Sequence, residues 1–337
     1  MRILRNLITG VALAGLSSTV AFAETTLRFA SFEPPVAFLT KNVFTPWAEQ
    51  VSAASGGTIK VKMFPGGTLG RSPAQQLKLV EDGVADIGWV IPGYTPGRFD
   101  EGTVGELPFL VQSSEAGSNA MWKLYEDGLL QGDYKKFKMI GIFTSYPNFV
   151  VSTKPVVKPS DMSGLSFRAP GPTLLSALEA LGSVPVGGIT GPTIAESMSR
   201  GLIDGTLSQW GAVSTFRIGE VAEHYLQAPL GATAMLVVMN KDKYDSLPDE
   251  AKAAIDAHSG GDFSDLFGKA FDSNVEASGV KEMARDGITV NAAEGELLEE
   301  WRAAVSVATE EWIASTENGQ TIHDAFKAAL SEYPGAF

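Results

Sequence analysis

A pattern of strand, glycine turn, helix and strand occurs twice in this chain of 337 residues. The first copy has the turn GGTLG at residues 66–70, followed by a helical stretch and by VADIGW at 84–89. The second copy has GGITG at 187–191, followed by a helical stretch and by LIDG at 202–205. Proline near the start of each helix and glycine just past its end are typical helix punctuation. The repeat therefore predicts two α/β lobes with the same order of elements.

Another unit of strand, helix and strand precedes each copy. Its expected elements lie at residues 27–30, 43–54 and 59–63 in the first half, and at 165–167, 174–181 and 184–186 in the second. Ligands of open α/β sheets bind outside the carboxyl ends of the strands. We therefore expect one cleft between the lobes, bordered by residues that follow these strands, namely Phe32, Trp89, Arg168 and Trp210.

The first 23 residues have the pattern of an export signal. Arg2 and Arg5 precede the apolar run at residues 7–16, and AFA at 21–23 has the small-x-small pattern that a signal peptidase needs. The apolar run is too short to span a bilayer. The chain has no cysteine, so neither a lipid-attached first residue nor a disulfide framework is expected. We expect a periplasmic protein that is not embedded in the membrane.

The remaining residues are expected to divide into two lobes, as is usual for a chain of this size. We assign residues 24–147 to lobe I and residues 148–231 to lobe II. The tail has helical patterns that are expected to bridge the lobes. We expect about 232–275 to complete lobe I and about 276–337 to complete lobe II.

The chain is acidic. Without Arg2 and Arg5 of the signal, 24 basic residues remain against 39 acidic ones, a formal net charge of about −15. This charge argues against nucleic acid as a partner. An acidic protein also repels anionic ligands at long range, so a carboxylate ligand would need a local cationic site.

Arg168 is the candidate for such a site, because it lies where a short expected strand ends. The residues LSFR at 165–168 alternate between apolar and polar, and Pro170 and Pro172 prevent the sheet from continuing. A guanidinium at a strand end can point into a cleft and hold a carboxylate through two hydrogen bonds. Taken alone, such an arginine is more often a surface ion-pair partner.

The sequence lacks the common catalytic templates. It has no GxSxG elbow, no GxGxxG turn and no cysteine nucleophile. Its three histidines, His224, His258 and His323, are far apart and lack metal-ligand spacing. Asp86 and Asp204 occupy equivalent places in the two repeats, which favours a structural role in accepting backbone hydrogen bonds. We expect no catalysis, no cofactor and no metal.

Several short sequence motifs occur in an order that is typical of one family. They are the signal, FPGGTLG at 64–70, GVADI at 83–87, ELPF at 106–109 and DMSGLSFRAP at 161–170. Together they resemble the periplasmic solute-binding proteins of TRAP transporters, of the DctP type, over essentially the whole chain. The segment WVIPGYTPGRF at 89–99 resembles one subgroup in particular. The resemblance implies an α/β, two-lobed periplasmic-binding-protein fold, with a ligand cleft between the lobes and long helices bridging them.

The resemblance also implies a receptor that binds a small organic acid and delivers it to a membrane permease driven by an ion gradient. Arg168 stands at the position whose arginine clamps the ligand carboxylate in that family. Family members usually have Asn-Pro, or in the subgroup Pro-Trp-Glu, where this chain has SQWG at 208–211. Trp210 is kept, but Gln209 and Gly211 replace its usual neighbours. The resemblance therefore implies the carboxylate clamp but does not identify the other end of the ligand.

The other candidates for the cleft are residues that belong either to the site or to the core and hinge. They are Phe32, Glu33, Trp89, Tyr146 and Asn148. Aromatic walls beside one cation favour an apolar or aromatic ligand body. Gln209 can hydrogen-bond a hydroxyl or keto oxygen beside the carboxylate. We expect a monocarboxylate, such as a 2-hydroxy, 2-oxo or aromatic acid, rather than a short dicarboxylate.

Two other functions stay open at this point. One is a ligand-binding module that serves a signalling sensor instead of a permease. The other is a secreted α/β enzyme, which the missing catalytic templates disfavour.

Overall fold

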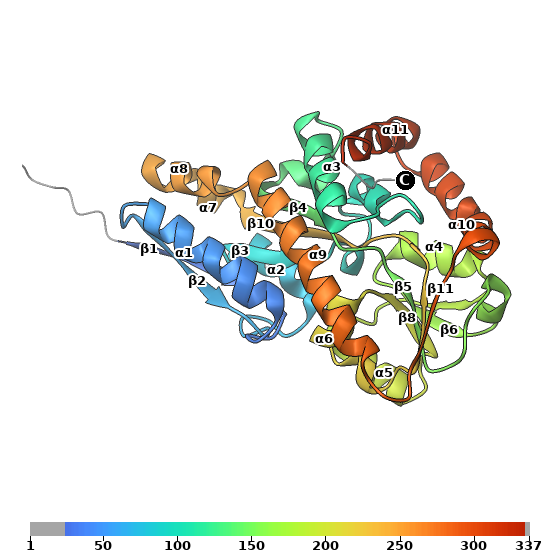
Figure 1. Cartoon of the computed structure of the whole chain (residues 1–337). Helices are drawn as coiled ribbons and strands as arrows, with labels where there is room; N and C mark the ends of the chain where they lie inside the picture. Colours follow the sequence, from blue (N-terminus) through green and yellow to red (C-terminus); the bar gives the residue numbers. More distant parts are fainter. Residues whose placement is uncertain (1–23, 334–337) are drawn as a thin grey trace, which may run out of the picture.

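The computed structural model describes residues 24–333, and the expected signal at residues 1–23 lies outside the described residues. Two α/β lobes lie next to one another, with the N-terminal third of the chain in one lobe and the central third mostly in the other (Figure 1). The α/β, two-lobed fold predicted from the repeat is confirmed.

Lobe I is built on a sheet with the strand order β2-β1-β3-β10-β4. Its strands are β1 (Thr25–Ala30), β2 (Ile59–Phe64), β3 (Ile87–Val90), β4 (Phe137–Thr144) and β10 (Ala234–Asn240). β1 is parallel to β2 and β3, whereas β10 lies antiparallel between β3 and β4. Its helices are α1 (Thr45–Ala54), α2 (Gln76–Glu81), α3 (Ser114–Glu126), α7 (Lys241–Asp245) and α8 (Asp249–Ala257).

Lobe II is built on a sheet with the strand order β11-β9-β5-β8-β6-β7. Its strands are β5 (Phe149–Ser152), β6 (Ser166–Arg168), β7 (Val184–Val186), β8 (Gly205–Ser208), β9 (His224–Gln227) and β11 (Thr289–Ala292). Its helices are α4 (Pro172–Ala180), α5 (Ile194–Ser199) and α6 (Trp210–Thr215). β6 is parallel to β7 and β8, and β5 is antiparallel to β8.

The chain passes between the lobes several times. Two crossings join β4 to β5 and β9 to β10, and the third is the long helix α9 (Gly261–Met283). α9 packs on α3 of lobe I and on α6 of lobe II, and it runs across both lobes in Figure 1. α9 therefore contacts both lobes along its length.

The last two helices lie on different lobes. α10 (Gly295–Ser315) packs on α4 of lobe II, and α11 (Gly319–Leu330) packs on α3 of lobe I. β11 and α10 belong to lobe II. The chain returns to lobe I at α11, because the apolar residues of this helix, Ile322 and Phe326 among them, belong to the core beside α3.

The two repeats share a structural detail at Asp86 and Asp204. Oδ2 of Asp86 accepts a hydrogen bond from the backbone nitrogen of Arg28 at 2.7 Å. Oδ2 of Asp204 accepts one from the backbone nitrogen of Ser166 at 2.8 Å. Each carboxylate therefore ties the start of its own strand, β3 or β8, to the strand paired with it in the sheet, β1 or β6, and the structural role predicted for both residues is confirmed.

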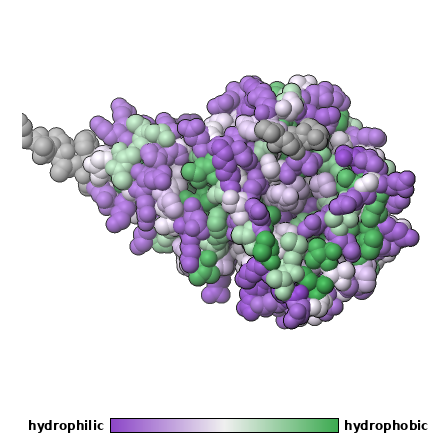
Figure 2. Space-filling view, in the orientation of Figure 1, coloured by the Kyte–Doolittle hydropathy of each residue, from purple (hydrophilic) through white to green (hydrophobic). Residues whose placement is uncertain are grey.

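The surface and the interior differ sharply in polarity. The face seen in Figure 2 is mostly hydrophilic, with apolar residues in small groups. Inside lobe I, Trp89 packs against Phe44, Phe143 and Phe267 with ring centroids 4.9 to 6.2 Å apart. No helix between residues 24 and 333 is long and apolar enough to cross a membrane.

Candidate functional site

A pocket lies between the lobes, at the carboxyl ends of β3, β6 and β8. The space enclosed by its lining residues, including the open mouth, is about 710 Å³. Six of the residues selected from the sequence line it together: Phe32, Glu33, Trp89, Asn148, Arg168 and Gln209. The parallel strands bring them together because their carboxyl ends meet at one edge of each sheet.

The other two selected residues, Trp210 and Tyr146, line a neighbouring groove beside α9 instead. Trp210 is buried between Phe149 and Tyr225, with ring centroids 4.8 Å away on each side. Its side chain belongs to the core of the molecule because α6 begins at this residue and turns it away from the pocket.

Arg168 is buried at the end of β6, with only 4% of its surface exposed. Its Nε donates a hydrogen bond to the carbonyl oxygen of Ile189 at 2.8 Å, and Nη2 donates one to the hydroxyl oxygen of Tyr94 at 3.1 Å. Nη1 donates no hydrogen bond within residues 24–333, and no carboxylate in that range forms an ion pair with this arginine. Burial lowers the pKa of Arg168, while Tyr94 and Glu106 act in the opposite direction.

Glu106 is the acidic group whose charge acts on Arg168, and it is completely buried. Oε1 accepts a hydrogen bond from the backbone nitrogen of Ala234 at 3.3 Å, and Oε2 has no partner among the described residues. Burial raises the pKa of Glu106 to about 8, against weaker opposing effects from Ala234 and Arg168. Burial therefore favours the protonated, neutral form of this carboxyl, which does not compensate the positive charge of Arg168.

Glu33 contributes a second buried carboxyl, at the wall of the pocket. Burial raises its pKa to about 7, and the nearby indole N–H of Trp89 acts in the opposite direction. That contact lacks the geometry of a standard hydrogen bond, because the indole nitrogen has no partner in the described part of the chain. Glu33 therefore titrates near neutral pH.

Tyr94 is a pocket residue that our sequence reasoning did not select. It ends a short 3-10 helix, Pro92–Tyr94, in the loop after β3 of lobe I. Its hydroxyl oxygen accepts hydrogen bonds from Arg168 and from the backbone nitrogen of Gly191 at 2.9 Å, both of which belong to lobe II. The subgroup phrase at 89–99 contains this residue, and that phrase was the available signal.

Gln209 has a fixed orientation at the start of α6. Oε1 accepts hydrogen bonds from the backbone nitrogens of Gly211 at 2.6 Å and Ala212 at 3.2 Å. The amide oxygen thus satisfies two donors that would otherwise be unpaired at a helix start. Its Nε2 donates no hydrogen bond to the described residues and belongs to a side chain that lines the pocket.

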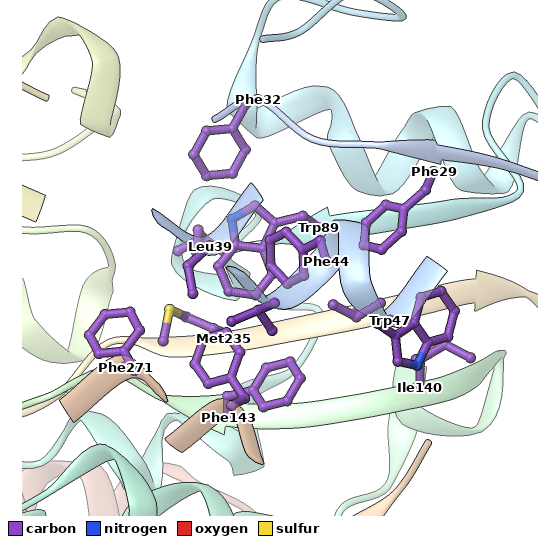
Figure 3. Packing of buried hydrophobic residues seen from close by; sticks show 14 of the residues in the cluster. Phe29, Phe32, Leu39, Phe44, Trp47, Trp89, Ile140, Phe143, Met235 and Phe271 are labelled. Carbon is purple, nitrogen blue, oxygen red and sulfur yellow. The ribbon is translucent and has the colours of Figure 1, made fainter. Parts of the chain in front are cut away.

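The apolar wall of the pocket comes from distant parts of the chain. Phe32 follows β1, Leu39 lies at the start of the helical segment that leads into α1, Met235 belongs to β10, and Phe271 belongs to α9. Figure 3 shows Phe32, Met235 and Phe271 at the edge of the aromatic cluster that faces the yellow-green segments of lobe II. Leu39, Met235 and Phe271 were also missed in the sequence, because their separation along the chain gives no local signal.

The family described as DctP, bacterial extracellular solute-binding protein, family 7, matches residues 29–316. The chain belongs to this family. DctP proteins are extracytoplasmic solute-binding receptors, and the family resemblance seen in the sequence is confirmed.

Solved structures of TRAP solute-binding proteins have the same fold. One from an unidentified marine microbe, specific for aromatic acid ligands and bound to 3-hydroxybenzoate, superimposes with a TM-score of 0.87. It is 33% identical and covers 92% of this chain and 99% of its own. Another, from Rhodoferax ferrireducens with copurified benzoate, has a TM-score of 0.86, 28% identity, and coverage of 91% and 98%. A curated relative, the outer membrane transporter protein TsaT of Comamonas testosteroni, is 24% identical over 97% of this chain and 98% of its own.

Proposed function

We propose that this protein is the extracytoplasmic receptor of a TRAP transporter, and that it captures an aromatic monocarboxylate through Arg168 and delivers it to a membrane permease. The observation that carries the proposal is the buried guanidinium of Arg168, which faces a pocket between the lobes without an ion-pair partner among residues 24–333.

The charge of Arg168 argues for an anionic ligand. A buried cation is costly unless it is paired and hydrogen-bonded. Ile189 and Tyr94 satisfy two of its donors with neutral oxygens, and burial favours the neutral form of Glu106. A ligand carboxylate would supply the missing negative charge and accept from the remaining donors.

The rest of the pocket argues for a single carboxylate on an aromatic body. Arg168 is the only lysine or arginine among the described residues that line the pocket. A second carboxylate would meet no second cation, and it would be repelled by Glu33 when that residue is ionised. Phe32, Met235 and Phe271 supply apolar contact area. The two solved relatives bind benzoate and 3-hydroxybenzoate, which have this composition.

Both lobes contribute to the pocket, so only a closed arrangement lets them contact the ligand together. Binding would therefore shift an equilibrium between open and closed forms toward the closed form. The receptor in its closed form would then be the one that a permease recognises.

Isothermal titration calorimetry with a panel of acids tests the proposal. The panel contains benzoate, 3-hydroxybenzoate and mandelate, with succinate and malate as short dicarboxylates. We expect at least one aromatic monocarboxylate to bind in the micromolar range or tighter and both dicarboxylates to bind at least a hundredfold more weakly. Binding of the dicarboxylates alone would refute the proposal.

A further inference from the structure

We propose that Gln209 and Asn148 form a site for a hydroxyl group of the aromatic acid, so that the receptor selects hydroxylated acids over unsubstituted ones. This inference rests on the proposed function, because it concerns the end of the ligand that Arg168 does not hold.

Gln209 offers a hydrogen-bond donor in a fixed direction. Two backbone nitrogens occupy its Oε1, so the amide cannot rotate to present that oxygen without leaving both of them unpaired. Nε2 remains for the pocket, and the side chain is 5% exposed. A neutral donor at this place fits an oxygen of the ligand better than an apolar carbon.

Asn148 offers the complementary acceptor. Its Nδ2 donates a hydrogen bond to Oγ1 of Thr233 at 3.1 Å, and its Oδ1 accepts none within the described residues. The residue is 2% exposed and lines the same pocket. The backbone of Asn148 is held on both sides, because it donates to Gly231 at 2.7 Å and accepts from Leu230 at 2.9 Å.

The sheet register brings the two amides together. β5 and β8 are antiparallel, and Phe149 is paired with Ser208. Asn148 precedes Phe149 and Gln209 follows Ser208, so they stand opposite one another where the two strands end. Residues opposite one another in such a pair are about 5 Å apart at their Cα atoms. One ligand atom can therefore reach both side chains.

A hydroxyl oxygen is the ligand group that fits this pair. It accepts a hydrogen bond from Nε2 of Gln209 and donates its proton to Oδ1 of Asn148. A keto or ether oxygen accepts only, and a bare ring edge does neither. Ser145 and Thr233, which also line the pocket, already use their side-chain oxygens in hydrogen bonds within the protein.

The position of the pair relative to Arg168 suits a substituted ring. β8 lies between β6, which ends in Arg168, and β5, which follows Asn148. A carboxylate on Arg168 would thus place its ring along the edge of the sheet, with the far substituents toward β8 and β5. The apolar wall of the pocket would cover the ring of the ligand between these two ends.

The test compares benzoate, 3-hydroxybenzoate, 4-hydroxybenzoate and the two corresponding methoxybenzoates by calorimetry on the full chain. We expect at least one hydroxybenzoate to bind roughly tenfold or more tightly than benzoate, as two hydrogen bonds predict. The methoxybenzoate of the same position should lose this advantage, because its oxygen has no proton to donate to Asn148.

The variant Gln209→Glu tests the donor directly. It keeps an oxygen for the start of α6 but replaces Nε2 by a second oxygen. We expect the affinity ratio of hydroxybenzoate to benzoate to fall toward one, while the melting temperature stays near that of the wild type. Gln112→Glu makes the same change at a residue of the neighbouring groove and should keep the wild-type ratio.

Three results would overturn the inference in distinguishable ways. If benzoate binds as tightly as every hydroxybenzoate and Arg168→Ala abolishes binding of them all, the hydroxyl site is wrong while the proposed function stands. If no aromatic acid binds to the wild type, the proposed function is wrong and the hydroxyl site with it. An unchanged ratio in Gln209→Glu would also refute the role of Gln209.

Discussion

The hydroxyl oxygen of Tyr94 in lobe I accepts a hydrogen bond from Nη2 of Arg168 in lobe II at 3.1 Å. The same oxygen accepts from the backbone nitrogen of Gly191 at 2.9 Å. With both lone pairs occupied, the proton of Tyr94 is left to donate to a ligand. One side chain thus connects the two lobes and orients the buried cation.

We predict that Tyr94→Phe weakens binding of an aromatic acid roughly tenfold or more. The change leaves two buried donors without an acceptor, each at a cost of about 1 to 3 kcal/mol. Calorimetry measures the affinity, and circular dichroism checks the fold. Tyr146→Phe is the matched control, because Tyr146 lines the neighbouring groove. This variant should bind the acid with wild-type affinity. Equal affinities in both variants would contradict this role of Tyr94.

We predict that Gly93→Ala disfavours the closed arrangement of the lobes. A Cβ at Gly93 would lie 2.7 Å from the carbonyl oxygen of Pro170 and 2.8 Å from Cα of Gly171, both of which are backbone atoms of lobe II. The lobes would have to separate slightly to relieve this overlap. Small-angle scattering with saturating ligand should show a larger radius of gyration than for the wild type, and affinity should fall.

Gly171→Ala creates the same overlap from lobe II, with Cα of Gly93 at 2.8 Å, and should reproduce the effect. Gly187→Ala is the control, since its Cβ would meet only the flexible side chain of Leu175, at 3.3 Å. If Gly93→Ala and Gly171→Ala both keep the wild-type radius of gyration and affinity, this contact does not limit closure of the lobes.

Arg168 illustrates how far the sequence reaches. The strand that ends before Pro170 is a local pattern, so the position of Arg168 at the edge of a sheet follows from neighbouring residues alone. The repeat predicted both lobes for the same reason. The direction in which a side chain points is harder to predict, because a shift of one residue along the chain turns the side chain to another face. Trp210 was expected beside Arg168, but the start of α6 turns it into the core.

Met235 and Phe271 could not be selected by the same reasoning. Met235 lies on a strand and Phe271 on a helix whose apolar residues look like ordinary core. Their place in the pocket depends on how the tail of the chain returns across both lobes. Only the packed structure supplies that information, as it also does for α11 on lobe I.

We predict that Glu106→Gln removes part of a pH dependence of stability. Burial raises the pKa of Glu106 from 4.5 to about 8, so the native state keeps a proton that the unfolded chain releases above about pH 4.5. Its contribution is fully present below pH 4.5 and is lost as the pH rises toward 8. Glu33, with a pKa raised to about 7, contributes in the same direction.

Urea unfolding at pH 5, 6, 7 and 8, followed by tryptophan fluorescence, measures this effect. Relative to the wild type, the free energy of unfolding of Glu106→Gln should rise by on the order of 1 kcal/mol per pH unit across this range. Glu49→Gln, on the exposed side of α1, serves as the control and should follow the wild type. Parallel curves for Glu106→Gln and the wild type would contradict the raised pKa.

Arg168 holds the carboxylate of the ligand in the proposed function, and calorimetric titration of Arg168→Ala with the tightest aromatic acid of the panel is the decisive test. Arg71→Ala removes the same charge from an exposed position and is the control. We predict no measurable binding for Arg168→Ala, with a native circular dichroism spectrum, and wild-type affinity for Arg71→Ala. A folded Arg168→Ala protein that binds the acid within twofold of the wild-type affinity would contradict the claim.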